Sequence, residues 1–306
     1  MARLAMKQHG SEFALEGLAF RDTLVLGNGA TVRVPAVMGV LNVTPDSFTD
    51  GGRYLDPEPA LAHALAMEAA GADIIDVGGE STRPGAGAVP IDEELRRLLP
   101  VLERLHERLR VPFSIDTRKA PVAQAALGLG AAMVNDVSGL GFDPAMAATV
   151  AQARASLVLG HTRGTPDEMA AHADYADPVE EVRAELAASV ARALAAGVPR
   201  GRIIVDPGFG FAKNGQHNLA LLAHLPRICT LGYPVMVGLS GKRLGVGRAM
   251  QLPGHSLARN AAAQVMAVVM GAAIVRVHEP GPVTEALRVV CAVKNAAQAG
   301  TTDDRA

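Results

Sequence analysis

Eight short runs of mostly apolar residues recur along the chain, and each is followed by a longer stretch that suits a helix. The runs are nearly continuous in apolar residues and are bounded by Gly, Pro or Asp, which is typical of strands buried on both faces. They are Val37–Val43, Asp73–Val77, Phe113–Ile115, Met133–Asn135, Ser156–Leu159, Ile203–Val205, Val235–Leu239 and Ile274–Val277. Eight strand–helix units in about 250 residues predict an α/β fold, the closed (β/α)8 TIM barrel, with an open doubly wound sheet as the alternative.

The segment before the first run has a different pattern. Residues 11–34 alternate between apolar and polar side chains around a Gly-Asn-Gly turn, which predicts a hairpin that caps the bottom of the barrel. We therefore expect three parts: an N-terminal extension (1–35) with this hairpin, a barrel (36–297) and a flexible polar tail (298–306).

Composition narrows the functional class. The net charge of −2 argues against a nucleic-acid-binding protein, and the chain has no Trp and few aromatic residues on which bases could stack. No run of about 18 apolar residues occurs that could cross a membrane. Two cysteines without metal-ligand spacing suggest thiols in a reducing compartment. We expect a cytoplasmic protein that binds neither nucleic acid nor membrane.

Polar residues stand at the ends of the predicted strands. They are Asn42, Asp76, Asp116, Asn135, His161, Asp206, Lys242, Arg276 and His278. Barrels of this type carry their active sites at the C-terminal ends of the strands, so these side chains are expected to share one mouth. Buried polar groups are costly without partners, which makes a chance accumulation less plausible. The pattern favours an enzyme.

The charges in this mouth divide by strand. Lys242, Arg243, Arg276 and His278 follow the last two strands, where such barrels often bind phosphate. An opposite, acidic side is expected from Asp76, Asp116, Asp206 and Asn135. Carboxylates and amides suit a heterocycle rich in N–H donors, so we expect a phosphorylated, amidine-like heterocyclic substrate. Single residues have plainer interpretations: Asn42 could cap a loop, and His161 suits a structural role better than that of a general base.

Several longer segments resemble one family, the bacterial dihydropteroate synthases, over residues 36–280. They are Met38–Gly52, Gly71–Gly85, Ser114–Arg118, Val134–Val137, Asp206–Phe211 and Arg276–His278. The resemblance implies a transferase with a (β/α)8 barrel. It would join p-aminobenzoate to 6-hydroxymethyl-7,8-dihydropterin diphosphate, giving 7,8-dihydropteroate and diphosphate in folate biosynthesis. It also favours a homodimer.

The resemblance assigns roles residue by residue. Asn42 matches a ligand of Mg²⁺ on the diphosphate. The positions that match pterin diphosphate ligands are Asp76, Thr82, Asp116, Asn135, Asp206, Lys242, Arg276 and His278. Those that match the p-aminobenzoate pocket, where sulfonamides compete, are Phe48, Thr82, Arg83, Pro84 and Phe211. Asp116, Asp206 and Lys242 match the catalytic positions.

The implied mechanism is dissociative. Diphosphate leaves first, with Mg²⁺ and the cationic side chains neutralising its charge. Asp116 is then the expected stabiliser of the pterin methylene cation, which the aniline nitrogen attacks.

Two departures from the family pattern leave alternatives open. Gly160 stands where a Met usually packs against the pterin ring, so a gap is expected there, and Gly241 replaces a usual Arg. A paralogue that binds pterin without turnover is therefore one alternative. A pterin-binding methyltransferase barrel of the corrinoid type is another, although the cationic side chains argue against it.

Overall fold

The computed structural model describes residues 23–44, 57–81, 87–165, 167–240 and 257–300, with side chains up to 296. Within them, eight parallel strands form one sheet in the order β8-β7-β6-β5-β4-β3-β10-β9. The strands are β3 (Ala36–Asn42), β4 (Ile74–Gly78), β5 (Phe113–Asp116), β6 (Met133–Asp136), β7 (Ser156–Gly160), β8 (Ile203–Asp206), β9 (Met236–Val237) and β10 (Ile274–Val277). The first barrel strand pairs with the last, as a closed barrel requires.

The two ends of the sheet meet between β8 and β9. A single parallel pair, Val205 with Val235, joins them, and Val205 N donates to Pro234 O at 3.0 Å. The sheet is thus a nearly closed (β/α)8 barrel. The barrel prediction is confirmed, and the open doubly wound alternative is wrong.

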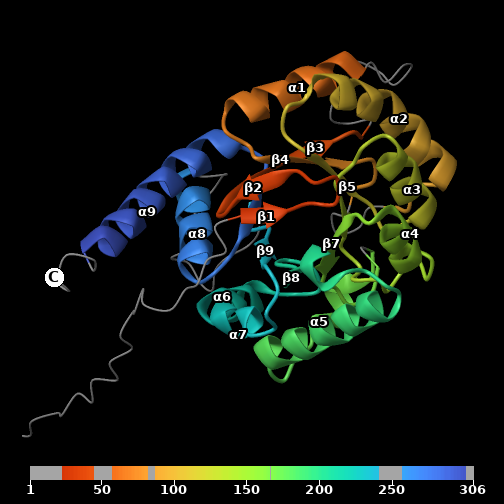
Figure 1. Cartoon of the computed structure of the whole chain (residues 1–306). Coiled ribbons are helices and arrows are strands. Elements are labelled where there is room, and N and C mark those ends of the chain that lie inside the picture. Colours follow the sequence, from red (N-terminus) through yellow and green to blue (C-terminus); the bar gives the residue numbers. More distant parts are fainter. Residues whose placement is uncertain (1–22, 45–56, 82–86, 166, 241–256, 301–306) are drawn as a thin grey trace, which may run out of the picture.

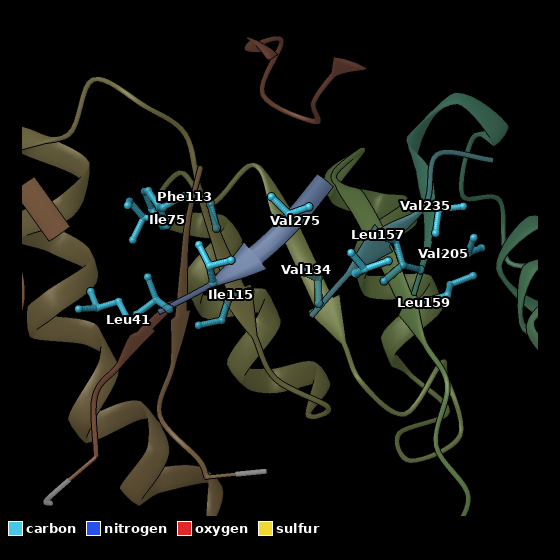
Figure 2. Packing of buried hydrophobic residues seen from close by; sticks show 14 of the residues in the cluster. Leu41, Ile75, Phe113, Ile115, Val134, Leu157, Leu159, Val205, Val235 and Val275 are labelled. Atoms are coloured by element: carbon cyan, nitrogen blue, oxygen red, sulfur yellow. The ribbon is translucent and has the colours of Figure 1, made fainter. Parts of the chain in front are cut away.

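Helices surround the strands (Figure 1). They are α1 (Pro57–Ala69), α2 (Ile91–Arg108), α3 (Ala120–Gly128), α4 (Met146–Ala153), α5 (Pro178–Ala195), α6 (Gly215–Ala223), α7 (Leu225–Cys229), α8 (Leu257–Val269) and α9 (Pro280–Gly300). Alternate side chains of each strand point outward to the helices, among them Leu41, Ile75, Ile115 and Val134 (Figure 2). Each buried aliphatic side chain of this kind stabilises the fold by about 1.5–3 kcal/mol relative to exposure.

A side-chain cap marks the start of α5. Asp177 accepts hydrogen bonds from the backbone N–H groups of Val179 and Glu180 and so caps α5, which is typically worth about 1 kcal/mol. Asp143, which also precedes a proline, does not cap a helix in this way, since α4 begins only at Met146. The Asp143 carboxylate instead accepts from Ala120 N and Ala145 N, so it ties the first turn of α3 to the turn before α4.

A small hairpin closes the N-terminal end of the barrel, as expected. Strands β1 (Thr23–Val25) and β2 (Thr31–Arg33) are antiparallel. Leu24, Leu26 and Val32 pack on the interior side chains of the barrel strands, including Met38, Ile74, Met133 and Ile204. Because apolar side chains fill this end, any polar site must lie at the opposite, C-terminal ends of the strands.

One expectation remains without a structural test. The division into extension, barrel and tail stays a prediction, since residues 1–22 and 301–306 lie outside the described residues. In the described part of the chain, no helix is long and apolar enough to span a membrane.

Candidate active site

Strand register places the polar side chains at one level of the barrel interior. Asp116 pairs with Asn135 on β6, and Asp76 pairs with Ser114 on β5. Side chains two residues apart share a face of a strand, so Ile74 and Asp76 of β4 both point into the barrel. Ile74 lies among the apolar interior side chains, and Asp76 lies two residues nearer the C-terminal end of the strand. The interior of the barrel therefore changes from apolar to acidic between these two residues.

Arg276 on β10 lies at the centre of this level. Its Nε donates to Asp76 Oδ2 at 2.6 Å, and its Nη2 donates to Asp116 Oδ2 at 2.6 Å. Asn135 Nδ2 also donates to Asp76 Oδ2, at 2.9 Å. Two carboxylates, an amide and a guanidinium from four strands therefore form one connected group.

This arrangement corrects one expectation. Arg276 was expected on a cationic side opposite the carboxylates, but it lies between Asp76 and Asp116. The physical reason is that an isolated buried carboxylate is very costly, and a guanidinium can pair with both. Among the described residues, Arg276 is thus part of the acidic group rather than opposite it.

Burial shifts the ionisation of this group. Burial of Asp116 away from water raises its pKa to about 7. The positive charge of Arg276 opposes this rise, and the negative charge of Asp76 adds to it. Burial alone would lower the pKa of Arg276, but the charges of Asp76 and Asp116 raise it further above its usual value. Asp206 contributes to the same rise, so β8 also faces this group. The arginine stays charged, and Asp116 titrates near neutral pH.

A tight turn at the end of β8 carries the next residues. Asp206 Oδ1 accepts from Gly208 N at 2.7 Å, and Asp206 O accepts from His161 N at 3.0 Å. Gly208 has a φ of +66°, and a Cβ there would lie 1.9 Å from His161 O. Only glycine permits this approach. The turn leads to Phe211, which is half-buried.

Two further expected site residues lie on neighbouring strand ends. His278 Nδ1 is 3.1 Å from Ser240 Oγ, which joins the end of β10 to the segment after β9. Asn42, half-buried, ends β3 and pairs in register with Gly78. A Cβ at Gly78 would lie 3.5 Å from Asp116 Cβ, so Asn42 belongs to the same mouth.

The remaining expected residues cannot be placed. They are Phe48, Thr82, Arg83, Pro84, Gly241, Lys242 and Arg243, which lie outside the described residues. Their roles stay predictions.

The structure changes the interpretation of Gly160. A gap was expected beside this residue, but a Cβ at Gly160 would lie 2.6 Å from Val137 Cα and 2.9 Å from Val137 O. The main chain after β6 thus occupies the space that a side chain would need. Gly160 O in turn lies where a Cβ of Gly139 would be, at 2.4 Å.

Two buried ionic groups were not expected from the sequence. Lys119 Nζ donates to Glu94 Oε2 at 2.5 Å and to Val89 O at 2.7 Å, and it also pairs with Glu80. Lys213 meets His161 behind the β8 turn. In the sequence, both lysines lie near glycine-rich or polar segments that follow strands. The spacing of the residues around them does not show that the two side chains are buried.

Comparison with known proteins agrees with this geometry. A family model described as "Pterin binding enzyme" matches residues 38–278. The dihydropteroate synthase of Mycobacterium leprae is 49% identical over 261 residues, covering 83% of this chain and 92% of the relative.

Two solved structures are similar throughout the fold. Xanthomonas albilineans dihydropteroate synthase with 4-aminobenzoic acid has a TM-score of 0.80 and 43% identity, covering 89% of this chain and 98% of the other. Thermus thermophilus dihydropteroate synthase in complex with 6HMPPP has a TM-score of 0.74 and 44% identity, covering 88% and 99%.

Proposed function

The chain belongs to the pterin-binding family as a dihydropteroate synthase, a transferase, and from that premise we propose how its own residues perform the reaction. The substrates are p-aminobenzoate and 6-hydroxymethyl-7,8-dihydropterin diphosphate, and the products are 7,8-dihydropteroate and diphosphate. The observation that carries the proposal is the group in which Arg276 joins Asp76 to Asp116. It offers hydrogen-bond acceptors to a ring rich in N–H groups and a fixed positive charge beside them.

The pterin binds by its polar edge to the acidic part of this group. Asp76 Oδ1 is buried and has no hydrogen-bond partner among the residues that the structure describes. A buried acceptor of this kind gains from a ligand donor. Asp116, Asn135 and Asp206 are the other pterin ligands of the proposal, with Lys242 reaching the ring from the segment after β9.

The first chemical step breaks the C–O bond between the pterin methylene and the diphosphate. The electron pair leaves with the diphosphate oxygen, where Arg276, His278 and Lys242 neutralise the charge. The ionised form of Asp116 stabilises the resulting methylene cation, which the pterin ring shares. Because Asp116 is preorganised by Arg276 at 2.6 Å, it needs no rearrangement during the step.

The second step forms the C–N bond. The aniline nitrogen of p-aminobenzoate donates its electron pair to the methylene carbon and then loses a proton to solvent. Phe48, Thr82, Arg83, Pro84 and Phe211 form the aminobenzoate pocket of the proposal. Exclusion of water by this pocket keeps the cation from being hydrolysed.

Magnesium is compatible with the residues present. Mg²⁺ prefers oxygen ligands and usually keeps waters and substrate phosphates with one or two protein ligands. The amide oxygen of Asn42, at the end of β3, suits this role. When bound, the ion would neutralise charge on the diphosphate.

A homodimer and a cytoplasmic location complete the proposal. Helices α8 and α9 pack side by side (Figure 1) and expose large apolar side chains, among them Leu257, Met266, Val289 and Val293. Several exposed large apolar side chains on one pair of packed helices are compatible with a subunit interface. The two free cysteines, both half-buried, suit a reducing compartment.

One assay tests the function. Purified protein with Mg²⁺, p-aminobenzoate and the pterin diphosphate should release diphosphate and form dihydropteroate in equal amounts, measured by a coupled phosphate assay and by chromatography. Binding of the pterin diphosphate without release would contradict an enzyme and leave a pterin-binding protein. Omission of p-aminobenzoate should abolish dihydropteroate formation.

A further inference from the structure

Three ionisable side chains form a line behind the β8 turn. Glu185 on α5 lies with its Oε2 2.8 Å from His161 Nε2, and His161 Nδ1 lies 2.8 Å from Lys213 Nζ. His161 is 4% exposed and Lys213 is 8% exposed, so both are buried in a region that the reaction proposed above does not use.

The hydrogens in this line can be assigned from the contacts. Lys213 Nζ donates to Gly208 O at 3.1 Å and Phe211 O at 2.9 Å as well as to His161 Nδ1, and His161 O lies farther away at 3.4 Å. An ammonium nitrogen carries only hydrogens and no lone pair, so it can only donate. His161 Nδ1 is therefore an acceptor, and the ring carries its hydrogen on Nε2, which donates to Glu185. The histidine is neutral between an anion and a cation.

The groups around His161 support this assignment. Burial lowers the pKa of His161, and the charges of Lys213 and Arg163 lower it further, while Glu185 opposes them. Arg163 Nε donates to Glu185 Oε1 at 3.1 Å, and its guanidinium stacks on Tyr175. On the other side, the ring of His217 meets the edge of Tyr175, and Glu181 pairs with Arg163.

The lysine binds the main chain of the turn that carries Asp206 and Phe211. The carbonyl oxygens of Gly208 and Phe211 accept hydrogen bonds from Lys213 Nζ. In the same turn, Gly208 N donates to the Asp206 carboxylate. Ala212, next to the lysine, has a φ of +48°, which turns the chain back so that Lys213 lies beneath its own loop. One ammonium group thus joins the two ends of the loop by its hydrogen bonds to Gly208 O and Phe211 O.

We propose that Lys213, oriented by the His161–Glu185 pair, is a positioning residue that sets the conformation of the Asp206–Phe211 loop and so the affinity for the pterin diphosphate. The proposal rests on the function given above, because that function places Asp206 and Phe211 on the substrates. Lys213 acts through the loop and touches no reacting atom.

The first test is kinetic. Lys213→Met keeps the length of the side chain and removes the hydrogen bonds of its ammonium group. It should raise KM for the pterin diphosphate at least about tenfold, since hydrogen bonds to charged groups are strong. The kcat at saturating substrate should change by less than about threefold. Glu185→Gln, which leaves the lysine in place, should raise the same KM to a smaller extent. Lys294→Met on α9 is the matched control and should leave both constants unchanged.

The second test reads the histidine directly. In the wild type, the Cε1–H signal of His161 in NMR spectra should report a neutral ring with hydrogen on Nε2 at pH 6–8. In Lys213→Met the opposing positive charge is gone, so His161 should take up a proton at a higher pH than in the wild type. This shift would show that Lys213 and His161 face each other as the structure has them. The rise in KM without a matching fall in kcat is the result that a purely structural lysine would not produce.

The outcomes separate the two proposals. A wild type that forms no dihydropteroate would overturn the proposed function. The titration of His161 would then still test whether Glu185, His161 and Lys213 form the hydrogen-bonded line. With an active wild type, an unchanged KM in Lys213→Met or an unchanged His161 titration would overturn the role of Lys213. Where Lys213→Met does not fold, Glu185→Gln carries both measurements. It should raise the same KM and, because Glu185 raises the pKa of His161, its loss should make His161 take up a proton only at a lower pH.

Discussion

Arg276 reaches Asp116 across the mouth of the barrel, with Nη2 2.6 Å from Oδ2, although 160 residues separate them in the chain. The same guanidinium holds Asp76. The acidic part of the site is therefore not a free cluster of carboxylates but a set of ion pairs that a ligand must join or displace. This relationship governs the first two predictions.

Replacing Asp116 with Asn should lower kcat by about a hundred- to a thousandfold, the usual loss for one preorganised electrostatic partner. The amide keeps the shape of the side chain but cannot stabilise the methylene cation with a charge. Steady-state kinetics at saturating substrates measure the change. Asp92→Asn, an exposed residue in the first turn of α2, is the control and should behave as the wild type. Near-normal turnover in Asp116→Asn would remove Asp116 from this role.

Activity should depend on pH near neutrality. Burial raises the pKa of Asp116 to about 7, so the side chain takes up a proton as the pH falls below that value. The reaction uses the ionised form, so kcat/KM should fall about tenfold per pH unit below the pKa and reach a plateau above it. A pH profile from 5 to 9 measures this, and the inflection should vanish in Asp116→Asn. A flat wild-type profile over this range contradicts the assignment.

The buried ion pairs of Lys119 predict a large effect on stability. Lys119→Met leaves Glu94 without its cation, while Glu80 keeps its pair with Arg118, and removing one partner of a buried pair typically costs about 3–5 kcal/mol. Denaturant unfolding measures the loss. Arg96→Met removes a solvent-screened pair with Glu93 and should leave the unfolding midpoint close to that of the wild type. Equal effects of the two substitutions would mean that the Lys119 pairs are effectively solvated.

Gly160→Met should damage the protein rather than restore a family feature. The new Cβ would lie 2.6 Å from Val137 Cα, so the main chain after β6 must move. Overpacking of this kind typically costs about 1–3 kcal/mol, and the displaced segment should also raise KM for the pterin diphosphate. Thermal unfolding and kinetics measure the two effects. Gly128→Ala, where a Cβ meets nothing within 4 Å, is the control. A Gly160→Met variant with wild-type stability would show that the space beside Gly160 is open after all.

Much of the barrel could be predicted because its signals are local. Continuous apolar runs show strands buried on both faces, and polar residues at their ends show where the mouth lies. Strand boundaries were less certain: the expected run Val235–Leu239 forms only the two-residue strand Met236–Val237. Pairing with one neighbour, β10, decides its length, and a sequence pattern does not contain that information.

Contacts across the mouth could not be predicted from the same signals. The position of Arg276 at a strand end was visible, but its choice of Asp76 and Asp116 depends on barrel closure. Lys213 follows a glycine-rich turn and reads as an exposed loop residue. It is buried only because Gly208 and Ala212 adopt positive φ values that fold the chain back over it. The space beside Gly160 likewise depends on the path of another segment.

The number of paired residues between neighbouring strands differs around the barrel. Ladders of several residues join most neighbouring strands, whereas β8 and β9 share one pair, Val205 with Val235. The wall can widen at this seam with the loss of little main-chain bonding. Asp206 ends one of the two strands there, and the segment beginning at Ser240 follows the other. Backbone amides along this seam should therefore exchange with deuterium sooner than those between β3 and β4, and a ligand that touches both sides of the seam should slow that exchange most.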